Sequence, residues 1–127
     1  MVLTEFGKFS RKLRIDHGEL LKDMAKKLGV TSAYLSAVEA GHRKIPEKWL
    51  ELIQNLYNMT AEETTAMREA YDCSINEIKI DLFEQSPSYK EAAIMFAREL
   101  KNFEETDLKD LLEKMKSINA NRKEQNI

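Results

Sequence analysis

The chain has 127 residues, of which 43% are hydrophobic and 33% charged, and its formal net charge is −2. This length and composition indicate one small domain, or one domain with an appendage, and they exclude a membrane-spanning helix because the longest apolar run, AAIMFA, is too short to cross a bilayer. A lone cysteine, Cys73, excludes an intrachain disulfide, and the N-terminal sequence lacks an apolar signal core, so we expect a cytoplasmic protein.

The two halves of the chain differ in charge. Residues 1–57 hold ten Lys/Arg and seven Asp/Glu, for a net charge of +3, whereas residues 58–127 hold ten and fifteen, for a net charge of −5. This asymmetry favours a mildly basic half that binds an anionic partner and an acidic half with another role. Chance scatter of charges is the alternative explanation.

Apolar residues at helical spacing predict three helices in the first third of the chain. These cover about residues 5–17, 20–28 and 32–40. Thr31 is placed to cap the third helix, and Gly29 suits the left-handed backbone that ends many helices. The second and third helices are therefore expected to meet at a tight turn.

Two more helices are predicted before the middle of the chain ends. Pro46 is expected in the first turn of the fourth helix, because proline tolerates that position. Thr60 and Glu63 form a capping-box pattern for a fifth helix at about 61–72.

The segment SINEIKIDLFEQ allows two interpretations. Ile78, Ile80 and Leu82 alternate with polar residues, which favours a short β-strand over 77–83. A helix is the alternative, because Ser74 and Glu77 also form a capping-box pattern. We favour the strand because β-branched residues dominate the segment.

The remainder of the chain is predicted to be helical with a polar end. One helix is expected at about 88–102, and a last helix is expected to run from a cap at Thr106 to about residue 118. The tail, 119–127, is expected to be flexible. The predicted domains are therefore 1–73, a C-terminal helical assembly region at 74–118, and this tail.

The corner between the second and third helices has a specific set of residues. Ala25 lets two helix backbones approach, Gly29 supplies the turn, and Val38 helps to fill the angle. This is the helix-turn-helix pattern, in which the second helix enters the major groove of DNA by its N-terminal end. The alternative is a corner of two helices that has no DNA-binding role. Such a corner can have Ala and Gly at this spacing, but it is less expected to have the full set, which is Met24, Ala25, Leu28, Gly29, Val30, Leu35, Ser36, Val38, Glu39 and Gly41.

Residues 5–57 resemble the λ/434 repressor and Cro-type helix-turn-helix domain of the XRE family, through the phrases FGKFSRKLR, DMAKKLGV, YLSAVEAG and HRKIP. The resemblance implies a mainly α fold with a five-helix DNA-binding domain. Members of this family are mostly transcriptional regulators of bacteria and phages that bind inverted repeats of double-stranded DNA as dimers. Some members are antitoxins that also repress their own operon.

The resemblance also implies which residues contact DNA. Those expected to face base edges are Ser32, Ala33, Ser36 and Ala37. Those expected to face phosphates are Thr31, Tyr34, Arg43 and Lys44. The third helix has no Arg, Asn or Gln for a bidentate base contact, so direct readout should be weak and DNA shape should contribute. For Tyr34, packing on Ala33 or Ala37 is the structural alternative.

One position departs from the family. Leu21 stands where members usually have a glutamine that binds a phosphate, so this contact is missing or is supplied by Lys22 or Ser10. Arg14 and Glu39 match a partly buried ion pair of the family, which orients the third helix. Two solvated charges are the alternative.

The sequence offers no catalytic or metal site. His17 and His42 have no Cys or acidic cluster at ligand spacing, and neither a nucleophile–base pair nor a glycine-rich phosphate loop is visible, so we expect no enzyme activity, no metal and no cofactor.

We therefore expect a sequence-specific transcriptional regulator, a dimeric repressor of bacterial, prophage or phage genes. A strand at 77–83 has no partner within the chain, so it would pair with its copy, or helices within 88–118 would pack across the dimer axis. Packing of those helices onto the fifth helix is the intrachain alternative. The competing function is an antitoxin-like or other regulator whose C-terminal half captures a protein partner.

Overall fold

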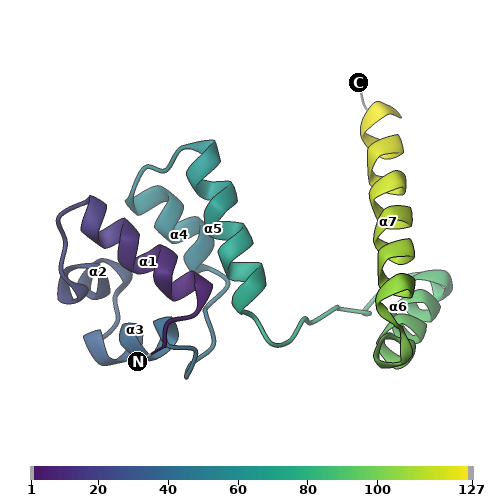
Figure 1. Cartoon of the computed structure of the whole chain (residues 1–127), viewed down its shortest axis with the longest axis horizontal. Coiled ribbons are helices and arrows are strands. Elements are labelled where there is room, and N and C mark those ends of the chain that lie inside the picture. Colours follow the sequence, from purple (N-terminus) through teal and green to yellow (C-terminus); the bar gives the residue numbers. More distant parts are fainter. Residues whose placement is uncertain (1, 126–127) are drawn as a thin grey trace. The chain divides into compact units, whose positions relative to one another are not determined.

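The computed structural model describes residues 2–125 and is mainly helical over this range (Figure 1). The chain divides into two compact units, one ending at Ile78 and the other beginning at Lys79, five residues later than the predicted boundary after Cys73. The helices of the first unit are α1 (Glu5–Asp16), α2 (Leu21–Leu28), α3 (Ser32–Glu39), α4 (Trp49–Leu56) and α5 (Ala61–Ser74). Those of the second are α6 (Pro87–Glu99), the short 3-10 helix η1 (Leu100–Asn102) and α7 (Glu105–Gln125).

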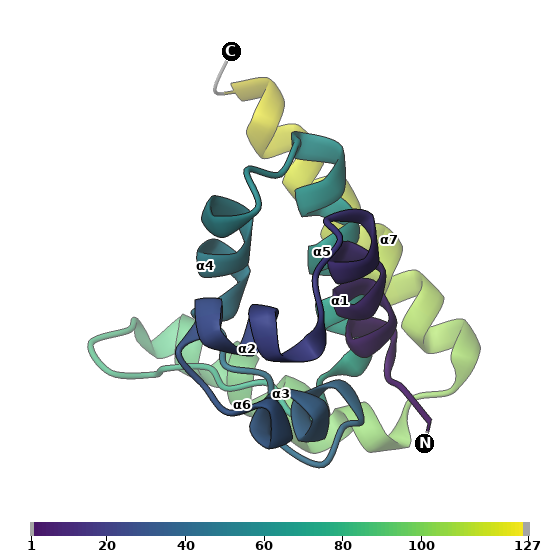
Figure 2. The same ribbon diagram turned by 90° about the vertical axis from the view of Figure 1, so that its left-hand side faces the viewer.

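The core of the first unit is formed by buried residues from all five of its helices, which surround it (Figure 2). α1 packs on α5 and on α3, and α2 packs on α3 and α4. The largest fully buried side chains are Trp49, Phe6, Met24, Leu35, Met67 and Val38. Burial of this much apolar surface is the main stabilising contribution to the unit.

Local sequence signals set most helix ends in the first unit. Thr31 precedes α3, and its hydroxyl oxygen accepts a hydrogen bond of 3.1 Å from the Tyr34 N–H. At α5, Thr60 and Glu63 each accept a hydrogen bond from the backbone N–H of the other, both 3.1 Å long, which completes the predicted capping box. Gly29 ends α2 with φ of +72°, a conformation that costs glycine nothing.

α1 and α3 approach each other closely at Gly7. A Cβ atom at this position would lie 2.1 Å from the carbonyl oxygen of Glu39, so only glycine fits without a shift of the backbone. The same oxygen accepts hydrogen bonds from the N–H and the hydroxyl group of Thr4, at 3.0 and 3.1 Å. These contacts fix the C-terminal end of α3 against the start of α1.

The prediction that Pro46 lies in the first turn of the fourth helix is wrong. α4 begins at Trp49, and residues 46–49 form a tighter turn in which the Trp49 N–H donates to the Pro46 carbonyl at 3.0 Å. The Leu50 N–H continues this three-residue spacing with the Glu47 carbonyl at 3.2 Å. Helical four-residue spacing starts only with the Leu52 N–H, which donates to the Lys48 carbonyl.

The predicted strand over 77–83 is also wrong. The structure has no strand among residues 2–125, and the segment from Ile75 to Ser86 is irregular, with neither strand nor helix. Ile78 and Ile80 are 79% and 50% exposed, so their alternation does not mark a buried sheet face. Among the described residues there is no second strand to bind its N–H and C=O groups, and within the segment the Phe83 N–H donates to the Asp81 side chain and the Gln85 N–H to the Leu82 carbonyl.

α7 differs from its prediction at both ends. It begins at Glu105 because the Asp107 side chain accepts a hydrogen bond of 2.9 Å from the Glu104 N–H, so Thr106 lies inside the helix and does not cap it. It continues to Gln125, so the predicted flexible tail is helical as far as that residue. The tail contains no Gly or Pro and is rich in good helix formers. Residues 126–127 of the predicted tail lie outside the described residues.

The second unit has no buried side chain. After Met67, every residue that the structure describes is exposed or half-buried. Among residues 2–125, no helix combines the length and the apolar character needed to cross a membrane.

Candidate functional site

α3 exposes a neutral face of small side chains. Leu35 and Val38 point into the core, and Glu39, the only charged residue of α3, is 3% exposed. The face that remains consists of Ser32, Ala33, Ser36 and Ala37, which are exposed or half-buried. Because it lacks carboxylates and bulky groups, this face allows the close approach of a polyanion.

The start of α3 favours negative charge. Thr31 is exposed, and its hydroxyl group is engaged in capping the helix. The first turn of a helix leaves backbone N–H donors without helical partners, and the helix dipole adds partial positive charge there. The N-terminal end of α3 is therefore suited to an anionic group such as a phosphate.

Tyr34 packs against aromatic and cationic neighbours. Its ring meets that of Trp49 edge to face, with centroids 6.0 Å apart, and the Arg43 guanidinium lies 6.0 Å from its centroid. Tyr34 also borders a surface hollow of about 540 Å³, whose other lining residues are Leu28, Gly29, Val30, Thr31, Pro46, Lys48 and Trp49.

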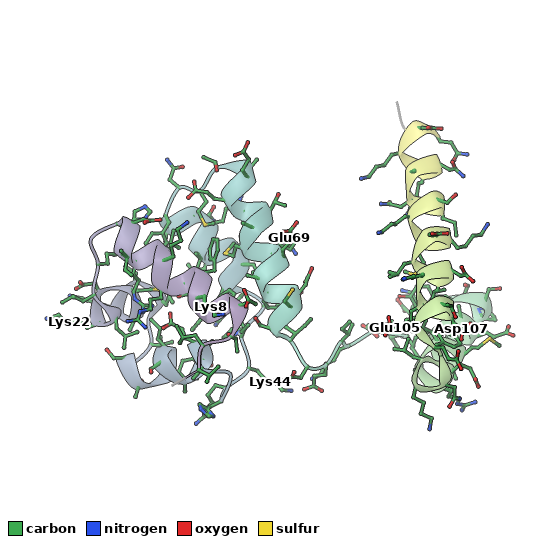
Figure 3. All side chains as sticks on the ribbon, viewed as in Figure 1. Lys8, Lys22, Lys44, Glu69, Glu105 and Asp107 are labelled. Atoms are coloured by element: carbon green, nitrogen blue, oxygen red, sulfur yellow. The ribbon has the colours of Figure 1, made fainter. Side chains whose placement is uncertain are left out.

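Three of the predicted phosphate-contacting residues are exposed cations. Lys22 extends from α2, and Arg43 and Lys44 belong to the loop after α3. Figure 3 labels Lys22 at the left of the first unit and Lys44 at its lower right. Lys44 forms an ion pair with Glu77, a residue just beyond α5. No sequence pattern indicated this pair, because the two residues lie far apart in the chain and on irregular segments.

The predicted ion pair between Arg14 and Glu39 is present and buried. The two residues are 7% and 3% exposed, and the pair joins α1 to the last turn of α3. The Met24 sulfur lies 3.6 Å from the same guanidinium nitrogen, so the charges are enclosed by apolar groups on this side. A buried pair of this kind fixes the orientation of α3 relative to α1.

The start of α2 has a different environment from the one expected. Ser10 is 2% exposed and donates to the Met24 sulfur at 3.2 Å, so it does not face solvent and cannot supply the missing phosphate contact. The Asp23 carboxylate accepts a hydrogen bond of 2.8 Å from the Leu20 N–H. This carboxylate occupies the position where an anion would bind the end of α2, so only Lys22 remains for such a contact.

A polar cluster that the sequence did not indicate joins the loop after α1 to α2 and α4. The Lys27 Nζ atom lies 2.6 Å from a Glu19 carboxylate oxygen and 4.8 Å from the centroid of the Tyr57 ring. Burial opposes ionisation of Glu19, but Lys27 and the neighbouring Tyr57 hydroxyl outweigh it and lower the pKa of this carboxyl group. Burial and the Glu19 charge raise the pKa of Tyr57 above its ordinary value.

His17 has structural surroundings. The Nδ1 atom of His17 lies 3.0 Å from the Leu13 carbonyl oxygen, and its ring packs edge to face on Tyr57 with centroids 5.0 Å apart. No group of three or more His, Cys, Asp or Glu residues is placed to hold a metal ion in the part of the chain that the structure describes.

Comparisons with protein families, with curated proteins and with solved structures found no match for this chain. Its function is therefore inferred from the geometry of the first unit.

Proposed function

We propose that the first unit is a helix-turn-helix DNA-binding domain of the λ-repressor type, and that the protein is a transcriptional regulator. α2 and α3 form the motif, and α3 enters the major groove by its N-terminal end. The observation that carries the proposal is the face of α3, which is small, neutral and accessible, while the only charge of this helix, Glu39, is turned inward.

The surroundings of α3 support this function. The tight turn at Gly29 and the ion pair between Arg14 and Glu39 hold α3 at a fixed angle to the rest of the unit. A groove-binding helix needs such a fixed angle, because phosphate contacts set its register and base contacts depend on that register.

The roles of individual residues follow from their chemistry. The hydroxyl groups of Ser32 and Ser36 contact base edges, and the methyl groups of Ala33 and Ala37 contact thymine methyl groups. The side chains that bind phosphates are Lys22, Thr31, Tyr34, Arg43 and Lys44. Lys44 has to exchange its contact with Glu77 for a phosphate, so its net contribution is smaller than that of Arg43.

The regulator is a cytoplasmic repressor that acts as a dimer on an inverted repeat in bacterial, prophage or phage DNA, without enzyme activity or cofactor. A two-fold dimer presents two copies of α3 to successive major grooves on one side of the duplex. Weak direct readout by Ser and Ala makes the symmetry and spacing of half-sites important for specificity.

Selection from a pool of random DNA fragments tests the proposal. Purified protein at physiological salt is expected to enrich one inverted repeat, with half-sites about one helical turn apart or a multiple of it. Retention of DNA without enrichment, or no retention, would contradict sequence-specific binding.

A pair of matched variants tests the phosphate contacts. Arg43→Ala with Lys44→Ala should weaken binding to all sequences. The double variant should also reduce the steepness of the salt slope, the slope of the logarithm of the binding constant against the logarithm of salt concentration, by roughly 1 for each phosphate that these side chains neutralise in the wild type. Arg98→Ala with Lys101→Ala removes the same charge from the second unit and should leave the slope unchanged. Equal slopes for the two double variants would refute the assignment.

A second candidate function is capture of a protein partner, as in antitoxin-like regulators. The absence of buried side chains among the described residues after Met67 favours it, because such a unit gains stability from a partner. Failure of the DNA selection with intact folding of the first unit would make this the better proposal.

A further inference from the structure

α7 carries an apolar stripe that the second unit covers only in part. Leu108, Leu111, Met115 and Ile118 follow one another at intervals of three, four and three residues, so they lie on one side of the helix. Leu108 and Leu111 are half-buried, whereas Met115 and Ile118 are 53% and 52% exposed. Within the described residues, no Cα atom of α6 lies within 8 Å of a Cα atom of α7, so α6 does not pack closely on the stripe.

The charges of α7 are divided between its two ends. Residues 104–113 hold five acidic side chains and one basic side chain, for a net charge of −4. Residues 114–125 hold four basic side chains and one acidic side chain, for a net charge of +3. Figure 3 labels Glu105 and Asp107 near the start of the helix. A helix of the same sequence that packs in the opposite direction therefore meets opposite charges, whereas a parallel helix meets like charges.

The stripe is symmetric about the level of Glu113. Leu108 and Ile118 lie equally far from this level on its two sides, and so do Leu111 and Met115. An antiparallel copy thus places each leucine opposite the partner's Ile118 or the partner's Met115. In each of these pairs, one of the two apolar positions of the heptad faces the other apolar position in the partner helix, as in antiparallel coiled coils.

The same register pairs charges at both ends of the stripe. Glu104 and Arg122 are also equally far from Glu113, and each lies on the continuation of the stripe. In the antiparallel pair, Glu104 faces the partner's Arg122 at each end, so the apolar layers end in opposite charges. In a parallel pair, each of these residues faces its own copy.

We propose that α7 is a dimerisation helix, which pairs antiparallel with α7 of a second copy across a two-fold axis level with Glu113. The proposal concerns the second unit and does not depend on DNA binding. Leu112, 51% exposed and beside the axis, adds apolar surface on one side of the seam. On the other side of the seam, Lys114 lies near Lys114 of the second copy. This is the one like-charge contact close to the axis, and it destabilises this register locally.

Disulfide formation between chains tests the direction of the pair. In a Cys73→Ser background, one protein carries Leu108→Cys and a second, isotopically labelled protein carries Ile118→Cys. The two positions are about 15 Å apart along a helix, beyond the reach of a disulfide. We expect mild oxidation of the mixture, without DNA, to yield mainly the mixed disulfide, and each protein alone to yield little. Disulfides formed by each protein alone, or none in any sample, would overturn the proposal.

Sedimentation equilibrium tests whether the stripe holds the dimer. Met115→Gln, in the stripe, should weaken dimerisation by at least about tenfold. Lys116→Gln, on the outer face of the same turn, is the matched control and should leave the dissociation constant unchanged. A wild-type monomer at the concentrations used for oxidation, or equal effects of the two variants, would contradict the proposal. Thermal unfolding of the first unit, which these variants do not touch, shows that the chain is folded in each case.

Discussion

Gly7 shows how a single residue sets the distance between two helices. Gly7→Ala introduces a methyl group at the Glu39 carbonyl, and the strain should exceed the gain in helix propensity, which is about 0.5–1 kcal/mol. We expect a net loss of about 1–3 kcal/mol in the free energy of unfolding, measured by urea denaturation. Lys8→Ala, at the neighbouring exposed position, should change it by less than about 0.5 kcal/mol. An unchanged stability of Gly7→Ala would show that α1 moves away from α3 at little cost.

The buried ion pair between Arg14 and Glu39 allows a test of whether its two charges stabilise each other. Arg14→Met leaves the Glu39 carboxylate buried without its partner and should cost about 3–5 kcal/mol. Adding Glu39→Leu removes the unpaired charge, so the double variant should be more stable than Arg14→Met alone. Denaturant titrations of the wild type, Arg14→Met, Glu39→Leu and the double variant give the coupling free energy. Additive losses would mean that the two charges do not stabilise each other.

At the scale of elements, sequence reasoning succeeded where a helix end depends on local chemistry. Thr31 and the Thr60–Glu63 capping box mark their helix starts because a cap needs only neighbouring residues. It failed at Pro46 and over 77–83, where the outcome depends on turn geometry and on the availability of a second strand. The start of α7 was missed because Thr106 resembles a residue that caps a helix from outside, whereas Asp107 lies inside the helix and accepts from the Glu104 N–H three residues before it.

The cluster around Glu19 connects elements through charge and predicts a pH dependence. The pKa of Glu19 is lower in the folded protein than the ordinary 4.5, so the unfolded chain binds more protons at acidic pH. The stabilisation that ionised Glu19 gives the folded protein is complete above the ordinary pKa. It is lost as the pH falls through the lowered pKa that Glu19 has in the folded protein.

Glu19→Gln should therefore destabilise the protein at pH 7 and make its stability depend less on pH below about 4.5. Urea denaturation across this range measures both effects. Glu69→Gln, which removes an exposed carboxylate of α5 (Figure 3), controls for the change in net charge. Parallel pH profiles of wild type and Glu19→Gln would show that Lys27 does not act through this carboxylate.

At the scale of the whole molecule, burial separates the two units more clearly than the sequence does. Both contain amphipathic helices, but only the first gathers its apolar residues into a core. The exposed face of α3 followed from helical spacing, because residues beside Leu35 and Val38 must point outward. The pairing of Lys44 with Glu77 had no such signal, because it depends on how the chain returns to the loop after α3.

The proposed dimer predicts a charge-reversal effect. Glu104→Arg places like charges at both ends of the α7 stripe and should weaken dimerisation by about twofold to tenfold, since exposed ion pairs are worth up to about 1 kcal/mol each. Glu104→Arg with Arg122→Glu restores opposite charges and should recover most of the affinity. Sedimentation at low and high salt measures both variants. A double variant no stronger than Glu104→Arg would argue against the antiparallel register.

The irregular segment from Ile75 to Ser86 has a consequence for how two copies of the first unit, the proposed DNA-binding unit, would act together. It begins at a fixed point, because the Ser74 hydroxyl at the end of α5 accepts a hydrogen bond of 2.9 Å from the Phe6 N–H. Twelve residues span at most about 40 Å when fully extended. A dimer joined through α7 would therefore hold the second copy of this unit at a high effective concentration near the first. Avidity through such tethers would let modest contacts at each half-site add up to tight binding.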